Sequence, residues 1–237
     1  MISQPYIWIT GASSGLGKAI TKNFYLKNYS VFATARRQKE LLSMKNELSV
    51  TGSGFLTYQS DISKLNDMRK SMDYLHQHGG SVECLINNAG ISSFKKVEED
   101  NLEDIQNIIN TNLLGAIYAI KAVLPAMIQK KQGTIINMIS VVTKKIFTQS
   151  SVYAASKSGL LAYTNVLREE VRKHNIRVIN IFPGATATAI WSDEILNNHG
   201  SKMMKPEEVA EVIVQLYNTK NSVVPEELHL RPITGDL

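Results

Sequence analysis

Short apolar runs alternate with longer segments of mixed polarity along the 237-residue chain. Each run is too short for a helix and apolar almost throughout, which is typical of a strand that is buried on both faces. The strands predicted from these runs span residues 6–10, 31–35, 55–59, 82–87, 134–139, 177–182 and 228–231.

The segments between these strands repeat apolar side chains about every 3.6 residues, as amphipathic helices do. Residues 16–27 and 67–76 are two examples, and Ser63 is predicted to cap the second. Pro206, followed by two glutamates, indicates a helix start. Buried strands joined through helices form right-handed βαβ units. The pattern therefore predicts one α/β domain over residues 1–237, built on a parallel sheet.

Composition narrows the class of protein. Hydrophobic residues make up 43% and charged residues 20% of the chain, as in ordinary soluble proteins, and the net charge of +5 is scattered without the basic block of a nucleic-acid-binding arm. Cys84 is the only cysteine and lies in an apolar run, so we expect a buried thiol and no internal disulfide. The longest apolar stretch, residues 113–128, is interrupted by Lys121 and contains Pro125. We therefore expect a cytoplasmic protein with no membrane span.

A glycine-rich turn joins the first predicted strand to the first predicted helix. It contains Thr10, Gly11, Ala12, Ser13, Ser14, Gly15, Leu16 and Gly17. Glycines let the backbone approach a ligand closely, and a helix N-terminus offers unpaired N–H groups at the positive end of its dipole. The turn predicts a site for the diphosphate of a dinucleotide. Tight packing without a ligand is the alternative interpretation.

The same turn also matches the G-x-S-x-G elbow of α/β hydrolases, with Ser13 as the nucleophile. That elbow needs an oxyanion loop from an earlier strand, and no strand is predicted before residues 6–10. It also needs an acid and a histidine downstream, and the five histidines have no obvious supporting context. A Ser13 hydrolase therefore ranks well behind a dinucleotide-binding protein.

Two arginines follow the second predicted strand. A site for NAD usually has an acidic residue here that bonds the ribose 2′-hydroxyl, but residues 32–39 contain neither Asp nor Glu. Arg36 and Arg37 are instead able to bind a 2′-phosphate through charge-assisted hydrogen bonds. The sequence favours NADP(H) as cofactor, with NAD(H) second. Two solvated arginines at a helix start are the alternative.

Tyr153 and Lys157 lie four residues apart in the helical segment 153–172, and so on one face of it. A free tyrosine has a pKa of about 10, which is too high for proton transfer near neutrality, and a neighbouring ammonium group lowers it. Ser140 follows the predicted strand 134–139, at the sheet edge where open α/β folds bind ligands. Its hydroxyl is placed to donate to a substrate carbonyl oxygen.

Together these motifs resemble the short-chain dehydrogenase/reductase family, in its classical form, over essentially the whole chain. The resemblance rests on the glycine turn, Asp61, Asn87-Asn88-Ala89-Gly90, Asn112, Ser140, Tyr153-x-x-x-Lys157 and Pro183-Gly184. Ser140 precedes Tyr153 by thirteen residues, the spacing usual in that family. The resemblance implies a doubly wound Rossmann fold, in which helices cover both faces of one parallel seven-stranded sheet with the order 3-2-1-4-5-6-7.

The resemblance also implies a reaction, the interconversion of a ketone or aldehyde and its alcohol by hydride transfer. In this scheme Tyr153 exchanges a proton with the substrate oxygen. Lys157 holds the nicotinamide ribose and biases Tyr153 towards phenolate, and Ser140 orients the carbonyl. Asn112 holds a water molecule of a proton relay behind Lys157.

A larger set of residues is implied to contact the cofactor. It comprises Gly11, Ser13, Ser14, Gly15, Leu16, Gly17, Arg36, Arg37, Asp61, Ile62, Asn88, Ala89, Gly90, Tyr153, Lys157, Pro183, Gly184, Thr186 and Thr188. Within it, the Asp61–Ile62 pair faces the adenine and residues 88–90 flank the adenosine ribose. Thr186 and Thr188 meet the carboxamide and phosphate side. Arg36 takes the 2′-phosphate, with Arg37 as second choice.

The expected partner is a small-molecule carbonyl or alcohol substrate, with no nucleic acid, membrane or metal. Loops 91–96, 141–152 and 185–204 are predicted to line its pocket, with Phe182 packed beneath. The four nearby lysines, Lys95, Lys96, Lys144 and Lys145, are interpreted as surface residues in preference to an anion site.

The resemblance also bears on the oligomeric state, and one alternative to an enzyme remains. Relatives assemble through helices corresponding to residues 104–127 and 153–172, which implies a homodimer or homotetramer. A non-catalytic NADP-binding sensor is the alternative to an enzyme. It would have little need for an intact serine, tyrosine and lysine set.

Overall fold

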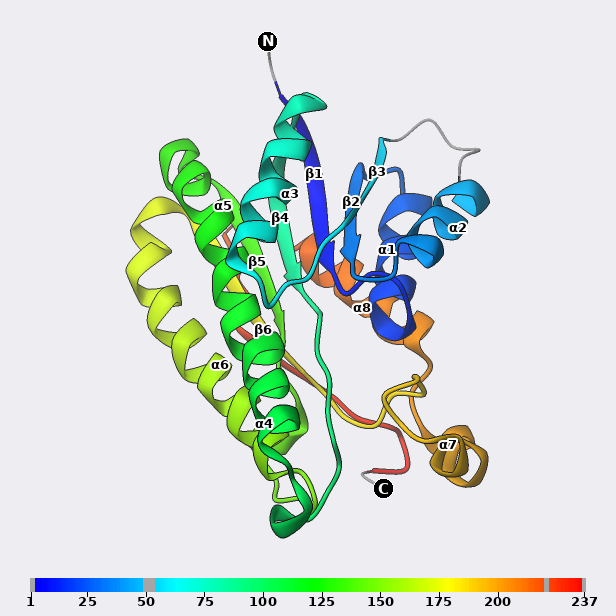
Figure 1. The fold of residues 1–237 in the computed structure, drawn as a ribbon. Coiled ribbons are helices and arrows are strands. Elements are labelled where there is room, and N and C mark those ends of the chain that lie inside the picture. The colour runs from blue at the N-terminus through cyan, green and yellow to red at the C-terminus, as the bar shows by residue number, and fades with distance from the viewer. Residues whose placement is uncertain (1–2, 49–53, 220–221, 236–237) are drawn as a thin grey trace.

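The computed structural model describes residues 3–48, 54–219 and 222–235. Within this part of the chain, seven parallel strands form one sheet in the order β3-β2-β1-β4-β5-β6-β7 (Figure 1). The strands are β1 (Gln4–Thr10), β2 (Val31–Ala35), β3 (Phe55–Gln59), β4 (Gly80–Asn87), β5 (Gly133–Met138), β6 (Ile176–Pro183) and β7 (Glu227–Leu230). Every predicted strand is present within two residues of its expected bounds. The doubly wound fold and its strand order are confirmed.

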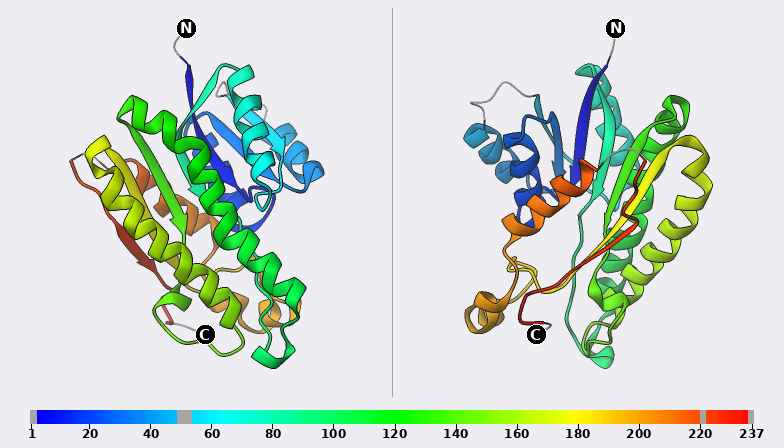
Figure 2. Two further views of the ribbon diagram at one scale, coloured as in Figure 1. Left: turned by 60° about the vertical axis from the view of Figure 1, so that its left-hand side comes forward. Right: turned by 180° about the vertical axis from the view of Figure 1, so that it is seen from behind.

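Helices cover both faces of the sheet (Figure 2). They are α1 (Gly15–Leu26), α2 (Gln38–Leu48), α3 (Leu65–Gln77), α4 (Leu102–Ile109), α5 (Ala116–Lys130), α6 (Ser151–Val171), α7 (Asp193–His199) and α8 (Pro206–Tyr217). Helices α1, α2 and α8 pack on one face, and α3, α5 and α6 pack on the other. The start of α8 at Pro206 is as predicted.

The central strand β1 shows how the sheet builds two cores. Ile7 and Ile9 point into the layer under α1 and α8, whereas Tyr6 and Trp8 point into the layer under α3 and α5. Successive strand side chains alternate between faces, so a strand covered on both sides is apolar at every position. This is why β1 appears in the sequence as a continuous apolar run. Cys84 on β4 is fully buried as expected, and burial raises the pKa of its thiol.

The predicted cap of α3 is wrong. Lys64, not Ser63, precedes the first helical residue, and its side chain makes no capping hydrogen bond. The Ser63 hydroxyl instead donates to Oδ1 of Asp61 over 2.7 Å. Serine side chains form local turns as readily as caps, and here the carboxylate of Asp61 is the stronger acceptor.

The segment expected as one helix over residues 104–127 is helical from 102 to 130, but six of its residues form a π-helical turn, Asn110–Gly115. By length and composition alone, this stretch would be able to cross a membrane, and 39% of its most apolar window is buried. The apolar run of residues 113–128 in the sequence did not indicate a helical stretch as long as residues 102–130. In the fold Ala119, Ile120 and Val123 pack into the sheet core, as expected for a core helix of an α/β protein.

The strand order reverses between β1 and β4, which are neighbours in the sheet but not in the chain. At such a switch point the loops that leave the carboxyl ends of the strands turn in opposite directions and open a crevice. The glycine turn follows β1, and Asn88 to Gly90 follow β4. The fold therefore brings these two motifs to one place.

Candidate active site

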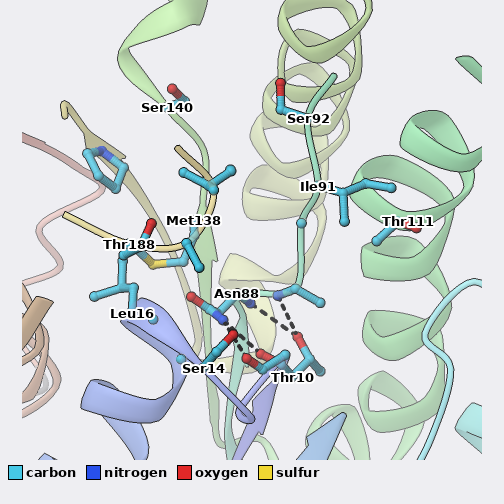
Figure 3. A pocket seen from close by; sticks show the side chains of 18 of the residues that line it. Thr10, Ser14, Leu16, Asn88, Ile91, Ser92, Thr111, Met138, Ser140 and Thr188 are labelled. Atoms are coloured by element: carbon cyan, nitrogen blue, oxygen red, sulfur yellow. Dashed lines mark hydrogen bonds between the residues drawn. The ribbon is translucent and has the colours of Figure 1, made fainter. Parts of the chain in front are cut away.

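A cavity of about 730 Å³ lies at the carboxyl ends of the strands on both sides of this switch point. Every predicted site residue except Asn112 lines it. Figure 3 shows Thr10, Ser14 and Asn88 at one end and Ser92 and Ser140 at the other. Predicted residues from seven segments of the chain thus meet around one space, although the role of each remains a prediction.

Hydrogen bonds hold the glycine turn against the end of β4 (Figure 3). The Thr10 hydroxyl accepts from the backbone N–H groups of Asn88 and Ala89, over 3.1 and 3.2 Å. The Asn88 amide donates to the Thr10 carbonyl oxygen over 3.0 Å. Because the turn is anchored in this way, the backbone of α1 meets the cavity at a defined position.

Two glycines of the turn have no room for a side chain. Gly11 has φ of +66°, and a Cβ there would lie 2.7 Å from Cα of Ala89. A Cβ on Gly17 would lie 2.3 Å from the Gly11 carbonyl oxygen. Opposite the turn, Thr188 would lie 3.1 Å from a Cβ on Gly15. Gly11 and Gly17 therefore keep the turn tightly packed on itself and on residues 88–89, and Gly15 lets the loop after β6 approach it closely. A turn of this kind at a helix N-terminus is suited to a diphosphate.

The two arginines differ in what they contact. Nε and Nη2 of Arg37 donate to the Ser13 hydroxyl over 3.2 and 3.0 Å. Arg36 accepts from Gln59 through its backbone oxygen, and its exposed side chain lines the same cavity. The structure thus places the guanidinium of Arg37 on the glycine turn, where the sequence ranked Arg36 first.

Asp61 and Ile62 line the cavity beyond the end of β3. The backbone N–H of Asp61 donates to Asp67 Oδ2 over 2.9 Å, and its own Oδ1 accepts from the N–H of Ser63 over 3.1 Å. Ile62 is buried and presents an apolar surface. A carboxylate held by local bonds beside an apolar side chain suits an adenine ring, which has polar edges and apolar faces.

Tyr153 and Ser140 both line the other end of the cavity. Ser140 follows β5 and accepts from the backbone N–H of Val142 at the start of a short 3₁₀ helix. Burial raises the pKa of the Tyr153 hydroxyl, and the Ser140 hydrogen bond opposes this only in part. In this structure Tyr153 is a neutral acid near pH 7, whereas the sequence predicted a pKa lowered by the neighbouring ammonium.

Lys157 is buried one helical turn after Tyr153. Its Nζ donates to the carbonyl oxygen of Met138 over 2.7 Å and lies 5.9 Å from the centre of the Tyr153 ring. Burial disfavours the charged form and lowers the pKa of Lys157 to about 8. Near neutrality the ammonium remains mostly protonated, but it is poised to lose its proton in mildly alkaline solution.

Asn112 lies in the π-helical turn and does not line the cavity. Its Oδ1 accepts from the N–H of Ile91 over 2.8 Å, and its Nδ2 donates to the Ile91 carbonyl over 2.9 Å and to the Ser156 hydroxyl over 3.0 Å. The side chain therefore fixes the loop that follows Gly90. Its water-holding role remains a prediction.

Comparison with known proteins identifies the family to which the chain belongs. A model described as short chain dehydrogenase matches residues 5–198. The chain belongs to this family. Two similar curated proteins are the sepiapterin reductase of Chlorobaculum tepidum, 32% identical over 236 residues (97% of this chain, 96% of the relative), and carbonyl reductase family member 4 of Xenopus laevis, 33% identical over 214 residues (88% and 89%).

Solved structures of similar proteins superpose closely on this short-chain dehydrogenase. A serine dehydrogenase complexed with NADP+ is 26% identical, with a TM-score of 0.91 over 98% of this chain and 96% of that chain. An alcohol dehydrogenase from the archaeon Thermococcus sibiricus complexed with 5-hydroxy-NADP is 25% identical, with a TM-score of 0.89 over 99% of both chains. The predicted family is confirmed.

Lys157 is the only lysine among the described residues that line the cavity of this short-chain dehydrogenase. Lys95 pairs with Asp104 over 2.5 Å, and Lys144 pairs with Glu227 over 3.6 Å. Phe182 is fully buried and stacks on His229 outside the cavity, in agreement with its predicted packing role.

Sequence reasoning missed three contacts of the site. Ser156 joins Asn112 to the first turn of α6, because its hydroxyl also donates to the Tyr153 carbonyl oxygen over 2.7 Å. Phe94 and Trp191 stack on one another across the cavity mouth. The sequence placed the two aromatic residues in pocket-lining loops, but no local signal indicated that they meet.

Gly17→Ala tests the packed glycine turn. The new methyl group would collide with backbone, so we expect the free energy of unfolding to fall by about 1–3 kcal/mol. Dinucleotide binding should weaken at least about tenfold, because the turn must shift from the conformation suited to a diphosphate. Denaturant titration and calorimetric binding measure both effects. Gly200→Ala is the matched control, since a Cβ there meets nothing within 4 Å; equal effects in both variants would contradict the packing argument.

Proposed function

We propose that this short-chain dehydrogenase reduces a small ketone or aldehyde to the alcohol with NADPH. The observation that carries the proposal is that Ser140, Tyr153 and Lys157 line one cavity together with the glycine turn. The similarity to a sepiapterin reductase and a carbonyl reductase supports the reductive direction.

Ser140, Tyr153 and Lys157 have separate roles in the proposed reaction. Bound NADPH supplies the hydride that reaches the carbonyl carbon. Ser140 donates a hydrogen bond to the carbonyl oxygen, and Tyr153 gives its proton to that oxygen as the C–H bond forms. A raised pKa suits Tyr153 to this direction, because the hydroxyl enters the reaction protonated. The buried ammonium of Lys157 stabilises the phenolate that remains.

The site also fits the cofactor. A Cβ on Gly15 would lie 3.1 Å from the Thr188 side chain, so the glycine turn and the loop after β6 approach each other closely, as around a diphosphate. Arg36 and Arg37 line the same cavity, and two similar structures contain NADP+ or a modified NADP. NADP(H) is therefore the proposed cofactor, with NAD(H) second.

A direct test of the function mixes the protein with NADPH and a panel of aromatic ketones, diketones and aldehydes, and follows the absorbance of the reduced nicotinamide. Turnover of one or more carbonyl compounds is the expected result. Tight NADPH binding without turnover of any compound would favour the non-catalytic sensor. Ester cleavage that is lost in Ser13→Ala would favour the hydrolase instead.

Removal of the arginines tests the choice of cofactor. Arg36→Ala and Arg37→Ala should each weaken NADPH binding by roughly tenfold, because a charge-assisted hydrogen bond contributes about 1.5–3 kcal/mol, and should leave NADH binding nearly unchanged. Contact with Ser13 leads us to expect the larger loss in Arg37→Ala. Arg69→Ala, on the exposed surface of α3, is the control. An unchanged NADPH/NADH ratio in both variants would refute the 2′-phosphate role.

Homo-oligomerisation through α4–α5 and α6 is a further part of the proposal. Val166 on α6 and Leu102 at the start of α4 are exposed apolar residues, at 61% and 83% exposure. The long helical stretch from 102 to 130 is also buried over less than half of its most apolar window. Apolar surface left open on these helices would be covered by a second copy of the chain.

A further inference from the structure

Two aromatic rings face each other at the substrate end of the cavity. Phe94 comes from the loop after β4 and Trp191 from the loop after β6. Their ring centres are 4.9 Å apart and their planes differ by 3°. The Phe94 ring also lies 6.1 Å from the Tyr153 ring, at 56°. A substrate whose oxygen contacts Tyr153 therefore lies within stacking distance of Phe94.

The two rings are held by different means. Nε1 of Trp191 donates to the Thr186 carbonyl oxygen over 3.1 Å, and its backbone N–H donates to the Thr188 carbonyl oxygen over 3.2 Å. Phe94 has φ of +45°, a left-handed conformation that is strained in a bulky residue. Such strain persists only where the surroundings hold it, and it is concentrated at functional sites. Here it turns the Phe94 ring onto Trp191.

Lys157 is the one charged side chain at this end among the described residues that line the cavity. Arg36, Arg37 and Asp61 line the opposite, nucleotide end of the cavity. The Ser92 Oγ is buried and has no hydrogen-bond partner among the described residues. Figure 3 shows Ser92 at the same end of the pocket as Ser140. An unsatisfied buried hydroxyl costs about 1–3 kcal/mol, which a polar group of a ligand would relieve.

We propose that Phe94 and Trp191 select a flat, uncharged, unsaturated ring next to the reacting carbonyl, and that Ser92 hydrogen-bonds a polar substituent of that ring. The inference rests on the reductase function proposed above and names its substrate class. The substrate ring stacks on one face of the Phe94 ring, and Trp191 packs against the opposite face of the Phe94 ring. Stacked aromatic pairs gain about 0.5–1.5 kcal/mol beyond their buried area, and a saturated or aliphatic carbonyl compound forgoes this gain.

The first experiment compares two diketones that differ in shape. The rate constant kcat/KM is measured with NADPH for phenanthrenequinone, which is flat and aromatic, and for butanedione, which is aliphatic. In Phe94→Leu and Trp191→Leu we expect the ratio of kcat/KM for phenanthrenequinone to that for butanedione to fall on the order of tenfold. Tyr58→Leu is the matched control, because it breaks another aromatic pair with ring centres 4.9 Å apart, outside the cavity.

A second readout needs no turnover. The chain has two tryptophans, and Trp8 is fully buried in the sheet core. Phenanthrenequinone should quench the tryptophan fluorescence of Tyr153→Phe through Trp191, and this quenching should disappear when Trp191→Leu is added. Ser92→Ala should weaken phenanthrenequinone binding without lowering the free energy of unfolding, because the removed hydroxyl has no partner among the described residues.

The two readouts separate the inference from the proposed function. If both diketones are reduced and their ratio is unchanged in Phe94→Leu and Trp191→Leu, the aromatic selection is overturned while the reductase stands. If neither diketone is reduced but Trp191-dependent quenching persists, the reductase is overturned while the flat-ring site stands. Absence of both the ratio change and the quenching overturns the inference.

Discussion

Replacing Tyr153 by phenylalanine is expected to lower kcat/KM for carbonyl reduction by roughly 10³-fold, while NADPH binding stays within about twofold. The change removes one hydroxyl and leaves the ring, so the packing against Phe94 is kept. The lost hydroxyl is the proposed proton donor to the substrate oxygen. Steady-state kinetics with NADPH and calorimetric NADPH titration check the two halves of the expectation.

Tyr163→Phe is the matched control for this substitution. Tyr163 lies on the same helix, α6, and burial also raises its pKa, but it does not line the cavity. We expect its kcat/KM to stay close to that of the unmodified protein. If Tyr153→Phe kept more than a tenth of the activity, the proton would have to come from another group, and the proposed mechanism would be wrong.

Replacing Lys157 by methionine is expected to abolish most activity and to make the protein more stable near neutral pH. Lys157 is buried with a pKa of about 8, against an ordinary 10.5, so the folded protein holds its charge at a cost. At about 1.4 kcal/mol per pH unit, this cost is about 3 kcal/mol. Loss of the hydrogen bond to Met138 subtracts about 1 kcal/mol. The expected net gain in unfolding free energy is therefore about 2 kcal/mol.

The stability gained by Lys157→Met is expected to decrease as the pH rises. Below about pH 8, Lys157 is charged in both the folded and the unfolded chain, so the full cost is present. Between about pH 8 and pH 10, the unfolded chain binds more protons, and the stability contributed by this group rises with pH. The advantage of Lys157→Met should therefore shrink over this range. Denaturant titrations near pH 7 and pH 9.5 measure it.

Lys130→Met is the control, because Lys130 is exposed and its removal should change stability by less than about 0.5 kcal/mol. A Lys157→Met variant that is less stable than the unmodified protein near neutrality would show that the buried ammonium is not destabilising. A stability difference that grows with rising pH would contradict the lowered pKa.

Local pattern was sufficient for most of the fold. Each of the signals lies within one short segment and restricts the backbone of that segment alone. They are the apolar strand runs, the turn from Thr10 to Gly17 and the proline at the start of α8. A parallel sheet then brings the carboxyl ends of its strands to one edge, so the predicted cofactor residues converge without further information. The predicted cap of α3 failed because the Ser63 hydroxyl donates to the nearby carboxylate of Asp61, and the helix begins one residue later than a Ser63 cap requires.

The composition of the site depended on partners far apart in the chain. Arg37 and Ser13 are 24 residues apart in the sequence, and Asn112 and Ser156 are 44 residues apart. Neither contact could be predicted from the local sequence pattern. The Phe94–Trp191 stack likewise joins two loops that only the sheet brings together. Side-chain contacts of this kind are set by packing, which periodicity does not encode.

The sequence by itself determined the doubly wound sheet, the glycine turn and the identity of the serine, tyrosine and lysine set, since these follow from backbone constraints and residue chemistry. Only the tertiary structure decided the charge states of that set. The expected effect of Lys157 on Tyr153 was opposed by burial, which raises the tyrosine pKa and lowers the lysine pKa. Desolvation depends on everything that surrounds a group, and the surroundings exist only once the chain has folded.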